Sequence, residues 1–514
     1  MKKIIINKSP WETRIAIVRD SKLENLFFGQ STDIELERSF FKGKVSKILP
    51  GIQTAFVDIG QERAGFLHIS EIDHDLALSR IMGTDQVDEI KEIVKEGERD
   101  IEEDVKPRMS SEKMDISKIL HEGEDLLVQV SKEPVDEKGA KLKTCFTLPG
   151  RFIVLTPNIP RIGVSKKIED RAQRLRLKEI ISKHLPAGMG AVIRTSAEGK
   201  SESEIQKDLS LLTSDWDNIL ALYKKAESKT KIYEDVDLSL QVVRDHLDGD
   251  IEEIITDNKE NHNEIYKYLS KVAPEFKYKV KLYEGSGNLF DRYDIDPQIK
   301  RALEKKVTLK SGGSIVVETT EALTVIDVNT GKFVGKGNLE ETILKTNLEA
   351  AREIVLQLKL RNIGGLIVID FIDMINTKNK LKLVSYFEQT LKELDKFQAV
   401  VLQVSEFGIV QMTRKRSGKT LMRQLTDVCH CCSGLGRLPS VRAESYEILR
   451  KLKVEIQTKF VKKNIFFEIN AAVFDFITSI EFNSILQLEK DFNCTITLVS
   501  NDTLTRHHFI AKEK

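Results

Sequence analysis

The sequence has few cysteines, no long apolar run and no excess of either charge. Cysteine accounts for only five of 514 residues, and three of these lie between positions 429 and 432. So few cysteines exclude a disulfide-stabilised scaffold and are typical of a reducing compartment. Apolar runs end well before the ~18 residues that a membrane helix requires, and residues 1–11 lack the apolar core of a secretory signal. We therefore expect a soluble protein of the cytoplasm.

Charge is balanced over the chain as a whole. The 80 Lys and Arg residues oppose 80 Asp and Glu residues, so the formal net charge is zero. Such a chain does not bind nucleic acid indiscriminately, and any site for a polyanion must be local. At ~150 residues per domain, the length predicts about three or four domains.

Short strands interrupted by Gly and Pro fill residues 41–72, and a strand pattern resumes at residues 126–130. This spacing predicts a small antiparallel barrel. Residues 76–124 are polar and rich in acids, without strand periodicity, so we expect an insertion into a barrel loop. A solvated helix or a disordered loop is favoured there over a partner site.

One face of the predicted barrel combines aromatic and basic side chains. Successive strand residues point to opposite faces, so Phe56 and Phe66 face outward, and Lys42 and Lys44 share a face of the preceding strand. Aromatic rings stack on unpaired bases and lysines neutralise phosphates, which favours single-stranded RNA as the ligand. The alternative is that both aromatics pack beneath a neighbouring domain. The strand order resembles an OB-type RNA-binding barrel first described in a ribosomal protein, which favours the RNA site.

Two later strands end in carboxylates. Residues 323–329 place Asp327 and Asn329 on one face, and residues 365–370 are apolar until they end at Asp370. A right-handed crossover would set these strands parallel and bring Asp327 and Asp370 to one edge of the sheet. The apolar second strand predicts a central strand that is covered by helices on both faces.

A helix is predicted between the two strands. Asn338, with Glu341 three residues later, marks its start, and Gly364 with Gly365 marks its end. Its apolar stripe consists of Leu344, Leu348, Ala351, Val355 and Leu358.

Two carboxylates this close repel each other unless they share a proton or a cation. Mg²⁺ takes one or two carboxylates and completes its shell with water and phosphate oxygens, so we expect Asp327 and Asp370 to bind a catalytic Mg²⁺. Asn329 is expected to contact the scissile phosphate or a metal-bound water, with Asp373 as a supporting acid. Capping or salt bridging remains the alternative for both ligands. The basic cluster of Arg414, Lys415 and Arg416 is either a contact for substrate phosphates or a solvated face.

Cys429 and Cys432 form a Cys-x-x-Cys pair with zinc-ligand spacing. Structural zinc takes four ligands, and the sequence has no second such pair, so we expect the same pair from two chains to share one Zn²⁺ in a homodimer. Completion of the site within the chain by His430 or Cys431 remains open. A redox pair is less favoured, because we expect no thioredoxin-like context around it.

These features, in this order, resemble the ribonuclease E/G family of bacterial endoribonucleases. The similarity is densest between Ser314 and Arg416, and it includes residues 347–351 and 364–374. It implies Mg²⁺-dependent cleavage of single-stranded, often AU-rich RNA that leaves a 5′-phosphate and a 3′-hydroxyl. Asp327 and Asp370 match the metal ligands of the family, and Asn329 matches the side chain near the scissile phosphate.

The resemblance also implies that the protein senses a 5′-monophosphate on its substrate. Arg194 and Thr195 match the sensing pair, with Gly139 as a nearby glycine. A guanidinium and a hydroxyl suit the several acceptors of a terminal phosphate. Two departures stand out: His430 replaces the proline of the usual Cys-Pro-x-Cys link, and the acidic insertion is atypical. The lack of an extended tail after Lys514 points to the shorter, G-type branch without a degradosome scaffold.

We therefore expect a multidomain α/β and α+β protein in which an OB-type barrel is inserted in an RNase H-like domain. The expected domains are an RNase H-like first part (1–36), the barrel with its insertion (37–134), a 5′-phosphate sensor region (135–239), an RNase H-like second part (240–302), a DNase I-like catalytic domain (303–424), a zinc link (425–438) and a small C-terminal domain (439–514). The expected function is Mg²⁺-dependent endoribonuclease activity in ribosomal RNA maturation and mRNA decay, by a zinc-linked dimer or a dimer of dimers. A non-hydrolytic RNA-binding or ribosome-associated protein is the alternative.

Overall fold

The computed structural model describes residues 1–30, 36–73, 115–134, 138–331, 339–395, 397–416, 418–459 and 464–513. The chain divides into two compact units, Met1–Leu421 and Met422–Lys514. Most of the acidic insertion and the expected helix start at Asn338 lie outside the described residues. Within the described ranges, no helix combines the length and apolar character needed to cross a bilayer.

The first sheet joins the N-terminal strands to strands from much later in the chain. Its order is β15 (Val280–Leu282), β14 (Ile251–Thr256), β1 (Lys2–Lys8), β2 (Glu12–Arg19) and β3 (Lys22–Gln30). Ile4 and Ile6 pack with α6 (Leu238–His246) and α7 (Lys259–Val272). Ile5 points to the other face, toward α8 (Leu289–Arg292) and α9 (Ile295–Leu303). Alternation along β1 therefore supplies two cores, one on each face of the sheet.

The expected barrel is present. Its ring consists of β4 (Phe40–Leu49), β5 (Thr54–Asp58), β6 (Gly65–His68), β8 (Lys141–Lys143) and β7 (Asp125–Lys132), and the β4–β7 pairing closes it. Short 3-10 turns η1 (Pro50–Ile52) and η2 (Ile69–Glu71) follow β4 and β6, and α3 (Ile116–Ile119) buries two isoleucines in the barrel core. A sixth strand, β13 (Thr230–Tyr233), pairs with β4 from a segment that the sequence analysis had placed outside the barrel.

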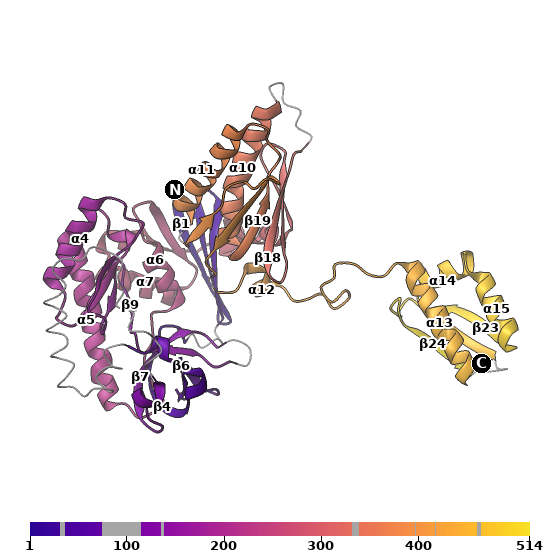
Figure 1. The fold of residues 1–514 in the computed structure, drawn as a ribbon, viewed down its shortest axis with the longest axis horizontal. Helices are drawn as coiled ribbons and strands as arrows, with labels where there is room; N and C mark the ends of the chain where they lie inside the picture. Colours follow the sequence, from indigo (N-terminus) through magenta and orange to yellow (C-terminus); the bar gives the residue numbers. More distant parts are fainter. Residues whose placement is uncertain are drawn as a thin grey trace. The chain divides into compact units, whose positions relative to one another are not determined.

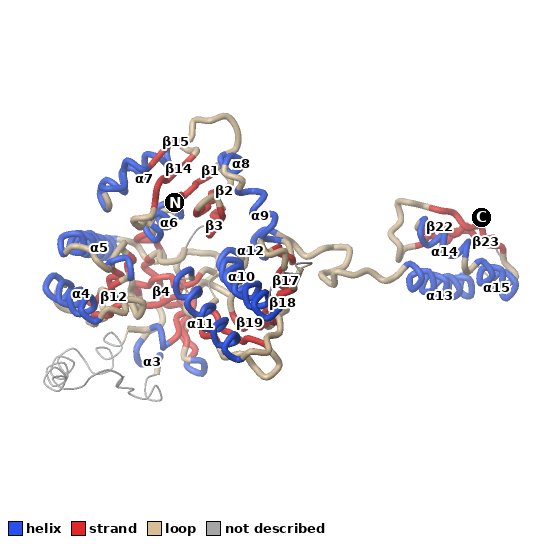
Figure 2. Tube along the Cα trace, turned by 90° about the horizontal axis from the view of Figure 1, so that it is seen from above, coloured by secondary structure: helices blue, strands red, loops and turns tan. Residues whose placement is uncertain are grey.

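A four-stranded sheet follows, in the order β11 (Ile162–Val164), β12 (Gly190–Ile193), β10 (Ile153–Thr156) and β9 (Leu148–Pro149). The helices α4 (Arg171–His184) and α5 (Glu202–Lys225) lie side by side against it (Figures 1 and 2) and share its hydrophobic core. Ser201 and Glu204 form a capping box that begins α5. The 3-10 turn η5 (Thr195–Ala197) leads out of β12, and η6 (Pro274–Lys279) precedes β15.

The last sheet of the first unit is mixed. Its order is β16 (Lys306–Thr308), β17 (Ser314–Thr319), β18 (Leu323–Asn329), β19 (Gly365–Asp370), β21 (Ile409–Arg414) and β20 (Ala399–Val401). The strands β18 and β19 pair in parallel, as expected, and the other pairings are antiparallel.

Helices α10 (Leu339–Leu360) and α11 (Thr377–Leu394) cover one face of this sheet (Figure 1). Ile326 and Ile367 are buried in the core that these helices share with the sheet. Val325 and Leu366 point the other way and are 37% and 44% exposed. The expectation that helices cover β19 on both faces was wrong, because its apolar side chains alternate between a buried face and an open one.

The second unit contains a three-stranded sheet, with β22 (Asn464–Ile469) between β23 (Thr495–Ser500) and β24 (Phe509–Glu513). Helices α13 (Val441–Lys459), α14 (Ala471–Ser479) and α15 (Phe482–Phe492) share its core. The short helix α12 (Leu421–Leu425) spans the boundary between the two units.

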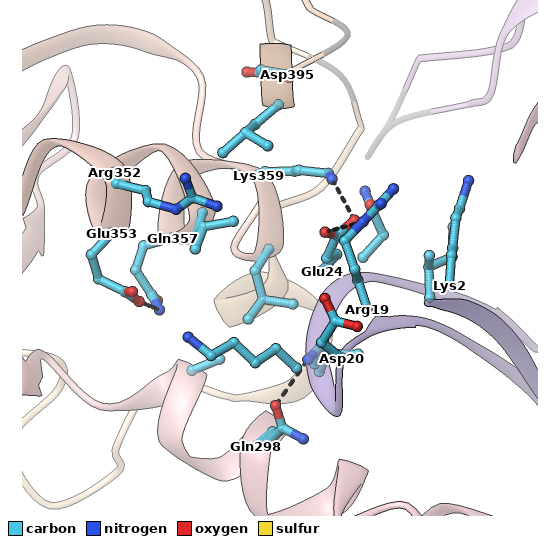
Figure 3. Close-up of a pocket in the computed structure, with 18 of the residues that line it drawn as sticks. Lys2, Arg19, Asp20, Glu24, Gln298, Arg352, Glu353, Gln357, Lys359 and Asp395 are labelled. Carbon is cyan, nitrogen blue, oxygen red and sulfur yellow. Dashed lines mark hydrogen bonds and ion pairs between the residues drawn. The ribbon is translucent and has the colours of Figure 1, made fainter. Parts of the chain in front are cut away.

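A cleft of about 1370 Å³ lies among the β2–β3 hairpin, α9, α10 and the end of α11 (Figure 3). Lys359 of α10 and Glu24 of β3 meet at its wall, with 3.3 Å between Nζ and Oε2, and each side chain is 13% exposed. This ion pair ties β3 of the first sheet to α10, a helix that packs on the last sheet. Thr195 also lines the cleft.

Candidate active site

The two strand-end carboxylates are neighbours. Asp327 of β18 is the register partner of Asp370 of β19. Adjacent strands lie ~4.8 Å apart, so both side chains project from the open face of the sheet at the same level. Asp327 is half-buried and Asp370 is exposed. The structure thus brings together the two acids that the sequence analysis selected.

Negative charge at this point has no cationic partner within the described part of the chain. None of the described Lys or Arg side chains pairs with Asp327 or Asp370. Asp370 is exposed, but desolvation by the surrounding chain, together with the nearby charges of Asp327 and Asp373, raises its pKa above the usual range. Asn329 donates a hydrogen bond from Nδ2 to Oδ2 of Asp327 at 2.6 Å. The pair can therefore gain stability from a cation.

The segment after β19 is held by a buried amide that the sequence analysis missed. Asn347 of α10 donates to the carbonyl of Ile372 at 2.8 Å and accepts from its N–H at 3.1 Å. Asp373 lies close to Gly408, where an added Cβ would come within 2.8 Å of its Oδ1. Asn347 lies next to the apolar stripe of α10 in the sequence, which could have indicated that its amide is buried. A fully buried amide requires hydrogen-bond partners.

The basic cluster at the end of β21 is divided: Arg414 is buried, whereas Lys415 and Arg416 are exposed. Arg414 is 2% exposed, and its Nε donates to Oδ2 of Asp395 at 2.6 Å. Arg416 packs against Gly365, where a Cβ would lie 2.7 Å from Nε. The reading of Arg414 as a contact for substrate phosphates is therefore wrong, because its charge is buried and paired within the chain.

Phe56 and Phe66 are register partners on the outer face of the barrel, and both are half-buried. Neither belongs to a hydrophobic cluster of the described residues, whereas Phe40 packs beneath the neighbouring domain against Phe146 and Trp216. An aromatic does occupy the domain interface, but it is Phe40 rather than the outward-facing pair.

The lysines around these aromatics include Lys44, as expected, and two that were not expected. A bulge between Val45 and Lys47 places Lys47 opposite Phe56, and Lys141 of β8 lies opposite Phe66 and pairs with Glu71. The sequence analysis missed Lys47 because strand alternation alone does not reveal a bulge, and it missed Lys141 because the pairing of β6 with β8 joins strands that are distant in the sequence. Lys44 is exposed and lies opposite Asp58.

Lys42 is bound to the C-terminal end of α5. Its Nζ donates to the carbonyls of Ala226 at 2.9 Å and Tyr223 at 3.4 Å, and it lies 5.2 Å from the centre of the Tyr223 ring. These contacts join β4 to the C-terminal end of α5, where a cation is favourable. The expectation of Lys42 as an RNA contact is corrected, because its charge is used within the fold.

Arg194 follows β12, and its Nη1 donates to the carbonyl of Gly150 at 2.7 Å and to Oδ1 of Asp245 at 2.8 Å. Thr195, the next residue, is exposed. Gly150 is therefore in direct contact with Arg194. Gly139, the glycine that we expected there, lies in the barrel against the backbone of Ala64.

Asp208 of α5 fixes the loop that carries Gly150. Its carboxylate accepts backbone hydrogen bonds from Arg151, Phe152 and Ile153 at 2.8 to 3.2 Å. Burial raises the pKa of Asp208, and the three N–H donors oppose this effect. A Cβ at Gly150 would lie 2.6 Å from Oδ2 of Asp208. Gly150 therefore allows the close approach of loop and helix.

The cysteine pair lies in a turn that presents N–H groups to sulfur. Backbone N–H groups of Cys432 and Cys431 lower the pKa of the Cys429 thiol, and Gly436 donates to Sγ of Cys432 at 3.4 Å. Such donors stabilise the thiolate, which is the form that binds zinc. Nowhere in the described ranges do three or more His, Cys, Asp or Glu side chains converge as a metal site.

Residues 147–417 match the model of the family described as Ribonuclease E/G family, and residues 428–514 match that of the RNase E/G, Thioredoxin-like domain. Ribonuclease G of Escherichia coli (strain K12) is 36% identical over 451 residues, which cover 88% of this chain and 87% of the relative. Ribonuclease G of Haemophilus influenzae is 38% identical over 450 residues with the same coverage. The chain belongs to the ribonuclease E/G family. Ribonuclease E of Haemophilus influenzae is 33% identical over 512 residues, 99% of this chain and 52% of that relative.

The two matched segments divide the candidate sites of this ribonuclease E/G family member. The first contains Arg194, Asp327 and Asp370, and the second contains Cys429 and Cys432. The description of the second segment corrects our expectation that no thioredoxin-like context surrounds the cysteines. The pair precedes α13 in a run of turns, however, and does not lie between a strand and a helix.

Proposed function

We propose that this protein is a Mg²⁺-dependent endoribonuclease that cleaves single-stranded RNA. Its place in the ribonuclease E/G family supports an endoribonuclease role in RNA processing. One observation supports the proposal of Mg²⁺ dependence: Asp327 and Asp370 are register partners on an open sheet face, and no described cation pairs with either. Maturation of ribosomal RNA and decay of mRNA are the proposed processes.

Asp327 and Asp370 would hold the metal. Their carboxylate oxygens are hard donors of the kind that Mg²⁺ prefers, and two protein ligands leave room for water and phosphate oxygens. A bound Mg²⁺ supplies a water of lowered pKa and offsets the charge that develops on the phosphodiester. Asn329 is oriented by its bond to Asp327, and its second N–H would donate to a phosphate oxygen. The proposed products carry a 5′-phosphate and a 3′-hydroxyl.

The barrel is the proposed surface for the single strand. Phe56 and Phe66 offer adjacent ring faces for stacking, and Lys47 and Lys44 offer charge to the phosphates. Lys47 and Lys44 form no hydrogen bond or ion pair with any described residue, which leaves both available.

Arg194 and Thr195, with Gly139, are the proposed sensor of a 5′-monophosphate, and the carbonyl of Gly150 orients Arg194. This proposal is supported by the partial exposure of Arg194, whose side chain is 29% exposed, and by the exposed Thr195 beside it. A fork of N–H donors next to a hydroxyl suits a terminal phosphate.

We propose that the chain contains an RNase H-like domain split between residues 1–36 and 240–302, an OB-type barrel and a DNase I-like catalytic domain. The pairing of β1 with β14 supports the split domain. A zinc ion shared by Cys429 and Cys432 of two chains remains the proposed link of a dimer or a dimer of dimers. The N–H donors around both sulfurs support this assignment.

The test is an assay with an AU-rich, single-stranded oligonucleotide that carries a 5′-monophosphate and a 3′ label. We expect the full chain to cut it with Mg²⁺ and not with EDTA, and each new downstream end to carry a phosphate. A hairpin of the same composition serves as the matched control and should be cut more slowly. Binding without cleavage under all conditions would instead identify a non-hydrolytic RNA-binding protein.

A further inference from the structure

The guanidinium of Arg194 is anchored at only one of its nitrogens. Nη1 uses both of its hydrogens, one on the carbonyl of Gly150 and one on Oδ1 of Asp245. No described residue accepts a hydrogen bond from Nε or Nη2. These two groups form the edge that makes paired hydrogen bonds to a phosphate. The internal contacts therefore orient the guanidinium and leave its binding edge available.

Asp245 is itself a fixed point. It lies in the last turn of α6, and its Oδ1 is 3.5 Å from Nε of Arg244. Arg244 makes two hydrogen bonds to Asp235, at 3.0 and 3.3 Å, and Arg38 at the start of the barrel contacts the same carboxylate at 3.2 Å. This alternating chain of charges ties α6 to the barrel, so Asp245 has little freedom to move.

The carboxyl group of Asp245 is ionised in the folded protein. Burial opposes ionisation, but the neighbouring guanidinium groups of Arg194 and Arg244 outweigh it and hold the pKa of this carboxyl below its usual range. An ionised carboxylate makes a stronger, shorter hydrogen bond to a guanidinium than a neutral acceptor does. The contact at 2.8 Å is therefore a stable anchor at neutral pH.

We propose that Asp245 is a positioning residue that orients Arg194 and thereby sets the preference for a 5′-monophosphate over a 5′-hydroxyl. The proposal rests on the proposed function, because it takes Arg194 as the group that contacts the phosphate. A long arginine side chain loses rotamer freedom when it binds a ligand, and anchoring it beforehand reduces that loss. Asp245 acts on the Nη1 side and leaves the Nε–Nη2 edge to the phosphate.

The experiment compares two oligonucleotides of one sequence, with a 5′-monophosphate or a 5′-hydroxyl, for the wild type, Asp245→Ala and Asp245→Asn. The measured ratio is kcat/KM for the 5′-monophosphorylated substrate divided by kcat/KM for the 5′-hydroxyl substrate. We expect Asp245→Ala to lower this ratio about tenfold, which corresponds to ~1.4 kcal/mol. The loss should appear as a raised KM for the monophosphorylated substrate, with kcat and the 5′-hydroxyl substrate unchanged. Asp245→Asn keeps an acceptor oxygen and should retain most of the preference.

Asp217→Ala, which removes an exposed carboxylate from α5, is the matched control and should leave the ratio unchanged. Asp245→Ser, whose hydroxyl is too short to reach Arg194, provides a second variant if the alanine variant does not fold. An unchanged ratio in the folded Ala or Ser variant would overturn the proposal. A raised ratio in both Asp245→Asn and Asp245→Ala would also overturn the proposal. Asp245 would then compete with the phosphate for Arg194 and would not position it.

Arg194→Ala separates this inference from the proposed function. If the sensor assignment is correct, Arg194→Ala lowers the ratio toward one, whatever Asp245 does. If Arg194→Ala leaves the ratio at the wild-type value, the sensor assignment itself fails. If only Arg194→Ala lowers the ratio and the Asp245 variants do not, the sensor stands and the positioning role is refuted.

Discussion

The acid pair and the phosphate sensor differ in how the fold compensates their charge. Asp327 and Asp370 lie side by side, and within the described chain they meet acids and an amide but no cation. Arg194 has the opposite arrangement, because Asp245 and the carbonyl of Gly150 already satisfy one end of its guanidinium.

The two proposed sites would bind charged ligands in different ways: the acid pair has no internal counter-charge, whereas Arg194 already has one. Uncompensated like charges are costly, and a ligand of opposite charge removes that cost when it binds. A charge that is already paired within the fold gains little free energy when a ligand binds. Its internal contacts do, however, hold it in a fixed orientation for that ligand. The acid pair is therefore suited to hold a cation strongly, and Arg194 is suited to discriminate between the ends of a substrate.

The largest expected effect tests the uncompensated pair. Asp370→Asn, and separately Asp327→Asn, should lower cleavage by roughly 1,000-fold or more, because a bound cation contributes several kcal/mol and each ~1.4 kcal/mol is tenfold in rate. Single-turnover cleavage and filter binding on one RNA measure the two steps separately, and binding should persist. Glu318→Gln makes the same change on β17, at a carboxylate that pairs with Lys305, and should cut normally. Undiminished cutting by either Asp variant would remove the metal assignment.

A smaller effect tests the oriented guanidinium. Gly150→Ala would place a Cβ 2.6 Å from Oδ2 of Asp208 and 2.8 Å from Cδ1 of Leu212. The loop should move off α5 and take the carbonyl that anchors Arg194 with it. We expect the preference for a 5′-monophosphate to fall roughly fivefold to tenfold, in line with the loss of an anchoring hydrogen bond.

Gly163→Ala is the control for this change, since its Cβ would meet only methyl carbons at 3.6 Å or more. It should leave the preference and the melting temperature unchanged. The same loss of preference in both variants would show that the sheet as a whole, and not the approach of Gly150 to α5, controls the sensor.

The sequence could predict the acid pair because local rules bring it together. Alternation within β18, the helix between the strands and the right-handed crossover are sufficient to place Asp327 beside Asp370. The surroundings of Arg194 follow no local rule. Its partners are 44 residues earlier and 51 residues later in the chain, and they meet it only through the packing of α6 and of the loop on α5. Gly139 and Gly150 were both available glycines, and no periodicity distinguishes them.

The barrel lysines show the same limit at shorter range. Alternation along residues 42–45 gave the correct face for Lys44, but the bulge after Val45 changes which lysine lies opposite Phe56. Bulges depend on the pairing of two strands, so one strand read alone does not reveal them. The role of Lys42 depended on α5, whose last turn supplies the carbonyls that it binds.

The smallest expected effect extends the comparison to these lysines. Lys47 has no partner among the described residues, whereas Lys42 is bound to the carbonyls of Tyr223 and Ala226. If a charge without an internal partner is the one that contacts RNA, Lys47→Ala should weaken binding of a single strand about threefold. It should also reduce the slope of log Kd against log salt by ~0.7, the value for one phosphate contact on a single strand.

Lys42→Ala should leave that slope unchanged and instead lower the melting temperature, because it removes a contact between the barrel and α5. Fluorescence anisotropy at several salt concentrations measures the slope, and thermal unfolding measures stability. Equal slopes for the two variants, both below the wild type, would show that internal pairing does not decide which lysines meet RNA. The distinction between compensated and uncompensated charge would then hold for the acid pair alone, where repulsion between like charges provides an independent reason for binding a cation.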